Sequence, residues 1–221
     1  MGPLLVLRPE PGASATAERA QALGLKTVVA PLFEVESVNW TAPEPTRFDG
    51  LLLTSANAIR HAGDKLESLR GLKAYAVGEA TAEAARDAGF DIGATGEAGV
   101  ERLLGSIEPD LRLLHLCGED RSEITDARQA ITPLVVYRSK PVDSPDLSEG
   151  PGCVALVHSP RAGRRLAELV TDRASTSIIA ISEAAAKAAG GGWKQVAVAD
   201  QPSDEALLAL ATSLCNKPDP E

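Results

Sequence analysis

The sequence predicts an α/β protein of two similar domains, each built on a parallel β-sheet. The first observation is an internal repeat at an offset of 104 residues, which aligns Leu52–Ala58 with Leu156–Ala162 and Ala76–Ala85 with Ala180–Ala189. Six of the ten positions in the second pair are identical. The second observation is that short apolar runs alternate with helix-forming tracts, as in βα units. A repeat of this length indicates two copies of one domain plan.

Each strand is predicted from a short apolar, β-branched run, and each helix from a longer tract that follows a cap residue. Strands are expected at Leu4–Leu7, Thr27–Val29, Leu32–Val38, Leu51–Leu53, Ala74–Val77, Ile92–Ala94, Leu111–Leu116, Ile131–Tyr137, Val154–Val157, Ser177–Ile181 and Gln195–Val198. Helices are expected at Ser14–Leu23, Asn57–Leu69, Thr81–Ala88, Gly99–Ile107, Asp120–Gln129, Arg161–Val170, Glu183–Ala189 and Ser203–Leu214. Helix N-caps are expected at Ser14, Ser55, Ser159, Ser182 and Ser203. Gly24 and Gly89 stand where helix C-terminal glycines belong.

The repeat also predicts where the domains divide. The middle segment has its own fifth strand near 111–116, so the leading strand–helix–strand unit is expected to join the C-terminal copy. The first domain would then be discontinuous, comprising residues 1–33 and 141–221, and the second would comprise residues 36–137. The extended crossings at 31–38 and 131–142 are expected to pair as a two-stranded hinge.

Composition excludes several classes of function. The formal net charge is −9, and the 221 residues contain no Lys/Arg run, so nucleic acid and anionic membrane are not expected partners. No signal peptide and no apolar stretch near the ~18 residues of a membrane span is found, so a cytoplasmic protein is expected. The three widely spaced cysteines are expected to be reduced thiols, and the three histidines show no metal-ligand spacing. The cysteines are Cys117, Cys153 and Cys215.

Small polar residues or glycines follow several predicted strands, at the sheet edge where open parallel sheets bind ligands. They are Arg8, Thr54, Ser55, Gly78, Gly118, His158, Ser159 and Ser182. Each precedes a helix, whose free N–H groups and dipole favour an anion, and two like domains are expected to enclose a cleft. The alternative for each serine is a helix cap with no other role.

Three further side chains admit two roles each. Arg8 is either a solvated arginine or a clamp for a ligand carboxylate. Thr81 lies in the first turn of its helix, where its hydroxyl either caps the helix or contacts a ligand. Tyr137 lies at the expected hinge, where its hydroxyl either enters the cleft or packs.

Several ordered motifs together resemble the uroporphyrinogen-III synthase family over nearly the full length. They are Leu7-Arg8-Pro9, Thr54-Ser55-Ala56-Asn57-Ala58-Ile59, Val77-Gly78-Glu79-Ala80-Thr81-Ala82, Gly96-Glu97, Val136-Tyr137-Arg138, Ser159-Pro160, and the tail from Ala199 to Leu207. The resemblance implies two flavodoxin-like domains joined by a β-ladder. It also implies an enzyme that cyclises hydroxymethylbilane, through an azafulvene and a spirocyclic pyrrolenine, to uroporphyrinogen III with ring D inverted.

The resemblance further implies a reaction without metal or cofactor, in which the protein mainly holds the reactive conformer. The family's hydroxyl positions correspond to Thr54, Ser55, Thr81 and Ser159, and its tyrosine to Tyr137. Thr81 and Tyr137 are the catalytic candidates. The substrate-binding candidates are Arg8, Thr54, Ser55, Asn57, Gly78, Gly118, Ser159 and Ser182. The second-domain motif, usually Gly-x-Thr-Thr, reads Ser182-Glu183-Ala184-Ala185 here and lacks those hydroxyls.

The resemblance implies a monomer that makes transient contact with the upstream bilane-forming enzyme. Another class of function also fits a cleft and a hinge: a non-catalytic two-domain binding protein or sensor for a small anionic ligand. A tight pocket with convergent polar groups would favour that sensor, whereas a wide cleft would favour the enzyme. A nucleotide-binding enzyme is disfavoured because no Gly-x-Gly-x-x-Gly or P-loop follows a predicted strand.

Overall fold

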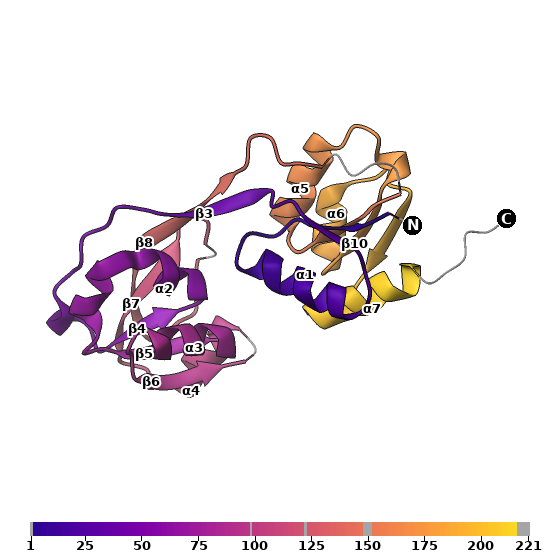
Figure 1. The fold of residues 1–221 in the computed structure, drawn as a ribbon. Coiled ribbons are helices and arrows are strands. Elements are labelled where there is room, and N and C mark those ends of the chain that lie inside the picture. Colours follow the sequence, from indigo (N-terminus) through magenta and orange to yellow (C-terminus); the bar gives the residue numbers. More distant parts are fainter. Residues whose placement is uncertain (1, 98, 122, 148–151, 216–221) are drawn as a thin grey trace. The chain divides into compact units, whose positions relative to one another are not determined.

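The computed structural model describes residues 2–97, 99–121, 123–147 and 152–215, and its chain divides into two compact units. Unit 1 comprises Met1–Glu34 and Pro141–Glu221, and unit 2 comprises Val35–Lys140. Figure 1 shows helices flanking a sheet in each unit. The predicted α/β class with parallel sheets is confirmed.

Unit 1 is built on a five-stranded, fully parallel sheet with the order β11-β10-β9-β1-β2. Its strands are β1 (Leu4–Val6), β2 (Thr27–Val29), β9 (Val154–Val157), β10 (Ser177–Ala180) and β11 (Gln195–Val198). Every residue of β1, β9 and β10 is buried, because these central strands are covered on both faces. Strands from the two ends of the chain therefore share one core.

Helices cover both faces of the unit 1 sheet. α1 (Gly12–Ala22) and α7 (Asp204–Cys215) pack on one face, against Leu4, Val6 and Leu156. They are the indigo and yellow helices that lie side by side in Figure 1. α5 (Pro160–Leu169) and α6 (Glu183–Ala189) pack on the other face. A 3₁₀ turn, η3 (Arg173–Ser175), precedes β10.

The remaining strands form a second sheet in the order β3-β8-β7-β4-β5-β6. They are β3 (Phe33–Ser37), β4 (Gly50–Leu53), β5 (Lys73–Val77), β6 (Ile92–Gly96), β7 (Arg112–Gly118) and β8 (Ala130–Pro141). This sheet lies in unit 2 except for the first two residues of β3 and the last residue of β8. The five from β4 to β8 are parallel. β3 runs antiparallel to β8, because Val38 N–H donates to the Val136 carbonyl and Val142 N–H donates to the Leu32 carbonyl.

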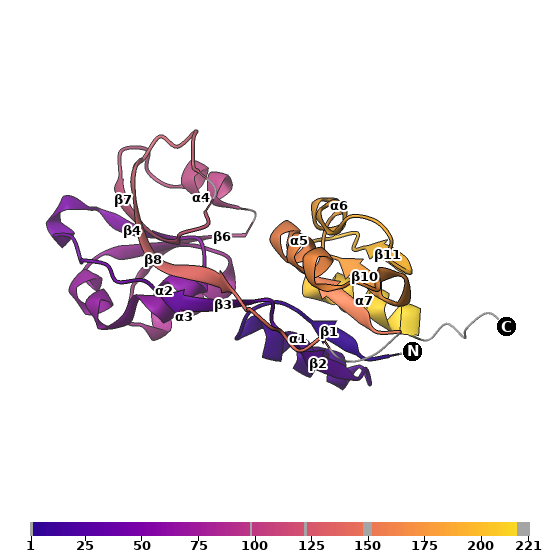
Figure 2. The same ribbon diagram turned by 90° about the horizontal axis from the view of Figure 1, so that it is seen from above.

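The helices of unit 2 also lie on both faces of their sheet (Figure 2). α2 (Ala56–Ala62) and α3 (Glu79–Asp87) pack on one face, against Leu51, Leu53 and Leu114. α4 (Val100–Ser106) packs on the other face through Leu103 and Leu104. The 3₁₀ segments are η1 (Pro45–Arg47) and η2 (Gly63–Leu69).

The two sheets have the same arrangement of strands in space, but the chain enters that arrangement at a different strand in each unit. If the five strands of unit 1 are renumbered 1 to 5 in chain order, their order across the sheet is 2-1-3-4-5. This is one of the two common orders of doubly wound sheets. Unit 2 has the same order if counting begins at β7, followed by β8, β4, β5 and β6. The 104-residue offset holds in the cores: Leu103 and Leu104 of α4 correspond to Leu207 and Leu208 of α7, and all four are buried.

The predicted helix over Asp120–Gln129 is wrong, because the described residues of that segment form no regular structure. Among its described residues, the apolar side chains that pack against the core are those of Ile124 and Ala127, too few for the apolar stripe that stabilises a surface helix. Gln129 anchors its end instead. Its side-chain amide donates to the carbonyls of Leu104 and Glu108, at 3.0 and 2.8 Å.

Two predicted helix boundaries also need correction. The helix expected over Asn57–Leu69 ends at Ala62, because Gly63 adopts a left-handed conformation with φ 70°. The rest is the 3₁₀ segment η2, whose buried Leu66 and Leu69 match its three-residue period. α1 begins at Gly12, with Pro11 as its N-cap residue, rather than at Ser14. Ser14 donates its N–H and its hydroxyl to the Glu10 carboxylate, so it lies inside the first turn instead of capping the helix.

Two cysteines of the described residues, Cys117 and Cys153, are buried free thiols. Within the described part of the chain, no helix is both long and apolar enough to cross a membrane.

Candidate functional site

The unit 2 sheet contains a topological switch point between β4 and β7. From β4 the chain proceeds to β5 and β6 on one side, whereas β7 and β8 lie on the other side. In open α/β sheets, the crevice outside the carboxyl ends of such strands is where ligands bind. β4 ends before Thr54 and Ser55, and β7 ends at Gly118.

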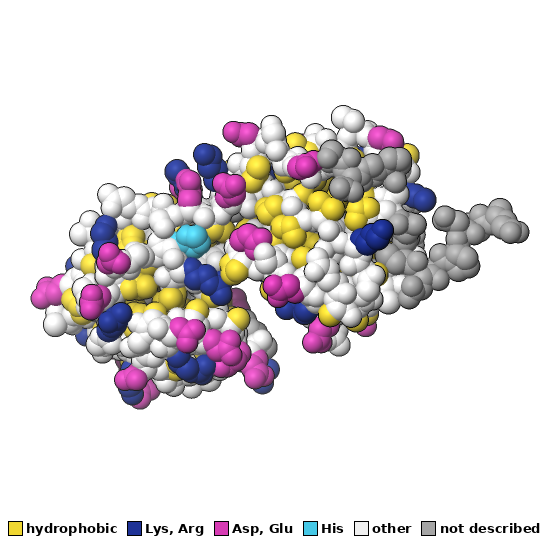
Figure 3. Space-filling view, viewed as in Figure 1, with side chains coloured by type: hydrophobic (Ala, Val, Ile, Leu, Met, Phe, Trp, Pro, Cys, Tyr) yellow, Lys and Arg dark blue, Asp and Glu magenta, His cyan; other side chains and the backbone are white. Residues whose placement is uncertain are grey.

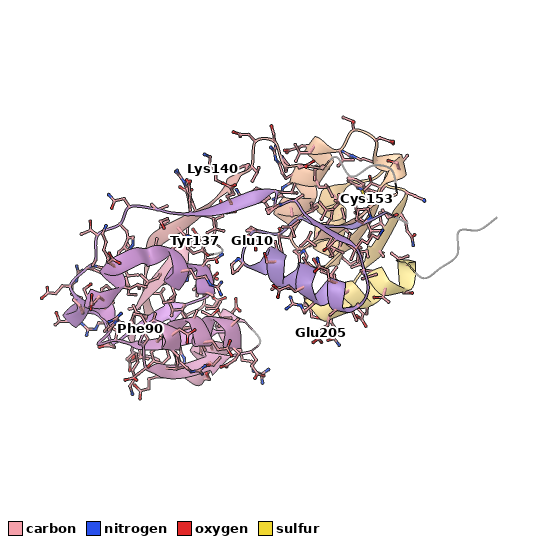
Figure 4. All side chains as sticks on the ribbon, viewed as in Figure 1. Glu10, Phe90, Tyr137, Lys140, Cys153 and Glu205 are labelled. Atoms are coloured by element: carbon pink, nitrogen blue, oxygen red, sulfur yellow. The ribbon has the colours of Figure 1, made fainter. Side chains whose placement is uncertain are left out.

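A pocket of about 320 Å³ lies at this switch point, within unit 2. Its volume falls at the lower end of the range typical of small-molecule sites. Figure 4 labels Tyr137, which enters the pocket from β8. The lining residues are Thr54, Ser55, Val77, Val100, Glu101, His115, Gly118, Asp120, Arg121, Glu123, Ile124 and Tyr137.

Thr54 and His115 form a hydrogen-bonded pair in the pocket wall. Thr54 Oγ1 lies 3.0 Å from His115 Nε2, and β4 and β7 pair in the register that brings their side chains together. Burial lowers the pKa of His115 to about 4, and the positive charge of Arg121 acts in the same direction. The imidazole is therefore neutral at pH 7, where only roughly one part in a thousand is protonated.

Tyr137 lies against Gly118 at the end of β7. A Cβ built on Gly118 would come within 2.8 Å of Tyr137 ring carbons and 3.0 Å of its hydroxyl oxygen. The glycine is therefore required by the close approach of this ring. The Tyr137 ring centroid also lies 6.3 Å from that of His61. These two neighbours hold the phenol at the pocket.

The pocket lining carries both signs of charge. Arg121 is exposed and brings the positive charge, and the carboxylates are those of Glu101, Asp120 and Glu123. Acidic and basic side chains are likewise interspersed on the face shown in Figure 3, with no basic patch among its described residues. An anion would thus be bound by individual donors rather than by a basic surface.

Unit 1 has its switch point between β1 and β9, and there the polar groups bind one another. His158, which follows β9, lies with Nε2 2.8 Å from Asp204 Oδ1. Arg8, which follows β1, lies with Nη1 3.4 Å from the same oxygen. Thr16 donates to Asp204 Oδ2 at 2.8 Å, and Arg19 forms an ion pair with that carboxylate.

Asp204 is the centre of this network. Burial alone would raise the pKa of its carboxyl, but hydrogen bonds from His158, Arg19 and Thr16 outweigh it and hold that pKa well below the usual range. Arg8 thus donates to an internal carboxylate. Gly12 allows this, because a Cβ there would lie 2.6 Å from Arg8 Nε.

Ser55, Ser159 and Ser182 cap helices, as predicted. Their hydroxyl oxygens accept backbone N–H groups: Ser55 from Asn57 at 3.2 Å, Ser159 from Ala162 at 3.1 Å and Ser182 from Ala185 at 3.3 Å. The helices that follow Ser55 and Ser182 have only seven residues each, so their dipoles are short. Among these serines, Ser55 lines the unit 2 pocket.

The remaining predicted residues of unit 2 lie beside the pocket rather than in its lining. Gly78 is the N-cap of α3 with φ 81°, and the buried Thr81 donates its backbone N–H to the Gly78 carbonyl. Asn57 lies in the first turn of α2. The structure therefore gathers Thr54, Ser55, Gly118 and Tyr137 in one pocket.

A family profile described as Uroporphyrinogen-III synthase HemD matches residues 14–209. The chain belongs to the uroporphyrinogen-III synthase family. A curated uroporphyrinogen-III synthase of Chlorobaculum parvum is 33% identical over 92 residues, which are 38% of this chain and 37% of that protein. The aligned part of the chain thus spans little more than a third of this relative.

Solved structures of the synthase family share the fold. The uroporphyrinogen-III synthetase of Helicobacter pylori matches 97% of this chain and 100% of its own, with a TM-score of 0.67 and 22% identity. A mutant synthase of the extremely thermophilic bacterium Thermus thermophilus matches 97% and 100%, with a TM-score of 0.56 and 17% identity.

Sequence reasoning missed His115, Val100, Arg121 and Asp204 as members of the two switch points. From sequence alone His115 is a packed strand residue, because its partner Thr54 is 61 positions away. The repeat offset was one signal that could have identified these residues, because it aligns Val100 with Asp204 and Thr54 with His158. That correspondence becomes informative only when the strand order is known.

Proposed function

We propose that this protein is a uroporphyrinogen-III synthase, which cyclises hydroxymethylbilane to uroporphyrinogen III with inversion of ring D. The observation that carries the proposal is the family match over residues 14–209. The fold shared with family structures over 97% of the chain supports it. The reaction would serve tetrapyrrole biosynthesis.

The pocket geometry supports a site that positions its substrate. Its lining contains the hydroxyls of Thr54, Ser55 and Tyr137, which suit the oxygen atoms of a bilane. Cyclisation requires the two ends of the linear chain to meet. Holding reacting groups together accelerates such a step without a strong acid or base. We assign Thr81 and Tyr137 as the catalytic candidates.

We propose substrate contacts on both units. The unit 2 pocket would hold one part of the bilane through Thr54, Ser55 and Gly118, with Gly78 and Asn57 beside it. In unit 1 the substrate-binding candidates are Arg8, Ser159 and Ser182. Arg8 keeps donors beyond those on Asp204 and Thr16, because a guanidinium has five N–H groups.

The direct experiment is to supply the protein with enzymatically made hydroxymethylbilane and separate the product isomers. Without enzyme the bilane closes to the type I isomer, so the type III isomer reports catalysis. We expect type III product in proportion to protein concentration. The exposed strand position Thr132 offers a control, since Thr132→Val should leave the yield unchanged. Only type I product, together with binding of the bilane, would instead favour the non-catalytic binding protein or sensor.

We further infer that the units are two flavodoxin-like domains joined by a β-ladder hinge of β3 and β8. The chain passes from one unit to the other through these strands. Motion between such domains is the default expectation. Small-angle scattering should therefore fit a range of domain angles, and a single angle with and without substrate would contradict the hinge.

We also propose a cytoplasmic monomer that uses no metal or cofactor and contacts the upstream bilane-forming enzyme transiently. Light scattering across protein concentrations tests the monomer. Activity of chelator-treated protein tests the reaction without metal.

A further inference from the structure

Thr54 and His115 both line the unit 2 pocket, and they also form a hydrogen bond with each other. An imidazole with a pKa near 4 is a poor general base and a poor reservoir of protons at neutral pH. It also brings no positive charge to an anionic ligand. What it can do is fix the direction of a neighbouring hydroxyl.

The role of this pair depends on the tautomer of His115. A threonine hydroxyl has one proton and two acceptor lone pairs. If His115 Nε2 carries the proton, it donates to Thr54 Oγ1 across the 3.0 Å contact, and the hydroxyl proton of Thr54 is free. If Nδ1 carries it, the Thr54 hydroxyl must donate to His115 and has no proton for a ligand.

We propose that His115 is a positioning residue: its Nε2–H holds the Thr54 hydroxyl so that Thr54 donates a hydrogen bond to a substrate carboxylate in the unit 2 pocket. This inference rests on the proposed synthase function and names one subsite within it. Arg121 in the same lining supplies a cation suited to that carboxylate.

The environment of the pair supports a role beyond packing. His115 is 3% exposed, and the strand residues around it are apolar, so a buried imidazole here is retained with one specific partner. At the equivalent place in unit 1, β1 carries Val6, which shows that the sheet accepts an apolar residue there. The polar pair lies at the switch point where the unit 2 pocket opens.

Four variants test the proposal by steady-state kinetics. Thr54→Val removes the donor, and His115→Leu removes the group that directs it. We expect each to raise KM about tenfold with kcat changed less than twofold, because a bound carboxylate is held alike in ground and transition states. The double variant should be no worse than either single one. His115→Gln, whose amide nitrogen can replace Nε2–H, should restore KM to within about threefold of the wild-type value.

A merely structural His115 predicts a different pattern. His115→Leu would then keep wild-type KM while His115→Gln, which buries an unmatched amide, would lower stability. That pattern overturns the proposal, provided that the wild-type protein makes the type III isomer. A role of His115 as a general base would give a third pattern. His115→Leu would then lower kcat and remove the low-pH limb of the pH–rate profile.

Nuclear magnetic resonance determines the tautomer of His115 without any measurement of activity. Long-range ¹H–¹⁵N spectra of the wild-type protein should show His115 as the neutral Nε2–H tautomer from pH 5 to pH 8, with Nε2 shifting in Thr54→Val. The Nδ1–H tautomer would overturn the proposal even if the synthase activity stands. If the protein yields only type I product while the Nε2–H tautomer is present, the synthase function fails and the carboxylate role of the pair fails with it.

Discussion

Val100 stands in unit 2 where Asp204 stands in unit 1. Each is the first residue of its helix, α4 or α7, and the two positions differ by the repeat offset of 104. The following leucines of both helices are buried in equivalent places. Asp204 draws the polar groups of its switch point together, whereas Val100 lines an open pocket. The exchange of Asp204 for Val100 is thus one of the differences between a filled edge and an open one, together with His158 in place of Thr54.

Val100→Asp tests this difference. An aspartate at the first helical position is tolerated by the helix, but its charge would stand in the pocket against substrate carboxylates. At an effective dielectric near 20 and partial screening, the repulsion is about 1–3 kcal/mol. We therefore expect KM to rise roughly ten- to a hundredfold.

The neutral variant Val100→Asn is the matched control, since it has nearly the same size without the charge. It should raise KM much less than Val100→Asp. Equal effects of the two variants would assign the loss to shape rather than to charge.

Much of the secondary structure could be predicted because it depends on local patterns. Val154–Val157 and Ser177–Ala180 are apolar runs of strand length, and both form fully buried central strands. Gly24 and Gly89 follow helices and adopt φ of 77° and 86°, as their positions predicted. These features follow from sequence spacing and from glycine's freedom at positive φ.

The candidate site was less predictable because it depends on strand register. His115 meets Thr54 only because β7 and β4 are neighbours, and Arg8 meets Asp204 across 196 positions of sequence. The helix predicted over residues 120–129 is wrong for another reason. Its residues have adequate helix propensity, but only two apolar side chains among those described pack against the core, and packing decides whether a short surface helix persists.

Asp204→Asn should destabilise the protein. The change leaves Arg8, Arg19 and His158 around a neutral amide, and loss of one partner from such a network costs about 2–4 kcal/mol. Urea unfolding at pH 7 measures it. The exposed Asp200 offers the control, because Asp200→Asn should leave the free energy of unfolding nearly unchanged.

The Asp204 effect should also depend on pH in one direction. The pKa of this carboxyl is lower in the folded state than in the unfolded state, where it is about 3.9. Its contribution is therefore present above that unfolded pKa and is lost as the pH falls towards the folded pKa. The stability gap between wild type and Asp204→Asn should shrink below about pH 4. A gap that stays constant from pH 7 to pH 3 would exclude this linkage.

Thr81→Ala should lower activity without abolishing it. If the hydroxyl donates to the substrate, losing a hydrogen bond to a charged group costs about 1.5–3 kcal/mol, or roughly ten- to a hundredfold in rate. The fold should tolerate the change, because the equivalent helix position in unit 1 is the buried Ala185. Thr81→Ser, which keeps the hydroxyl, should retain most of the rate, and a Thr81→Ala enzyme with full turnover would limit Thr81 to packing.

Gly118→Ala should impair the enzyme through Tyr137. The added methyl would lie 2.8 Å from ring carbons of Tyr137, so the phenol must leave its place at the pocket. Gly118 is absent from the positive-φ glycines, and the effect is therefore steric rather than conformational. We expect kcat/KM to fall roughly tenfold, as for Tyr137→Phe, because both changes remove one hydroxyl contact from the substrate.

The double variant Gly118→Ala/Tyr137→Phe distinguishes the causes. If the methyl acts by displacing the Tyr137 hydroxyl, the two losses are not additive, and the double variant should be no slower than Tyr137→Phe. Fully additive losses would show that Gly118→Ala distorts β7 itself. A Tyr137→Phe enzyme with wild-type kcat/KM would remove the phenol hydroxyl from the site and leave Tyr137 as a packing residue beside His61.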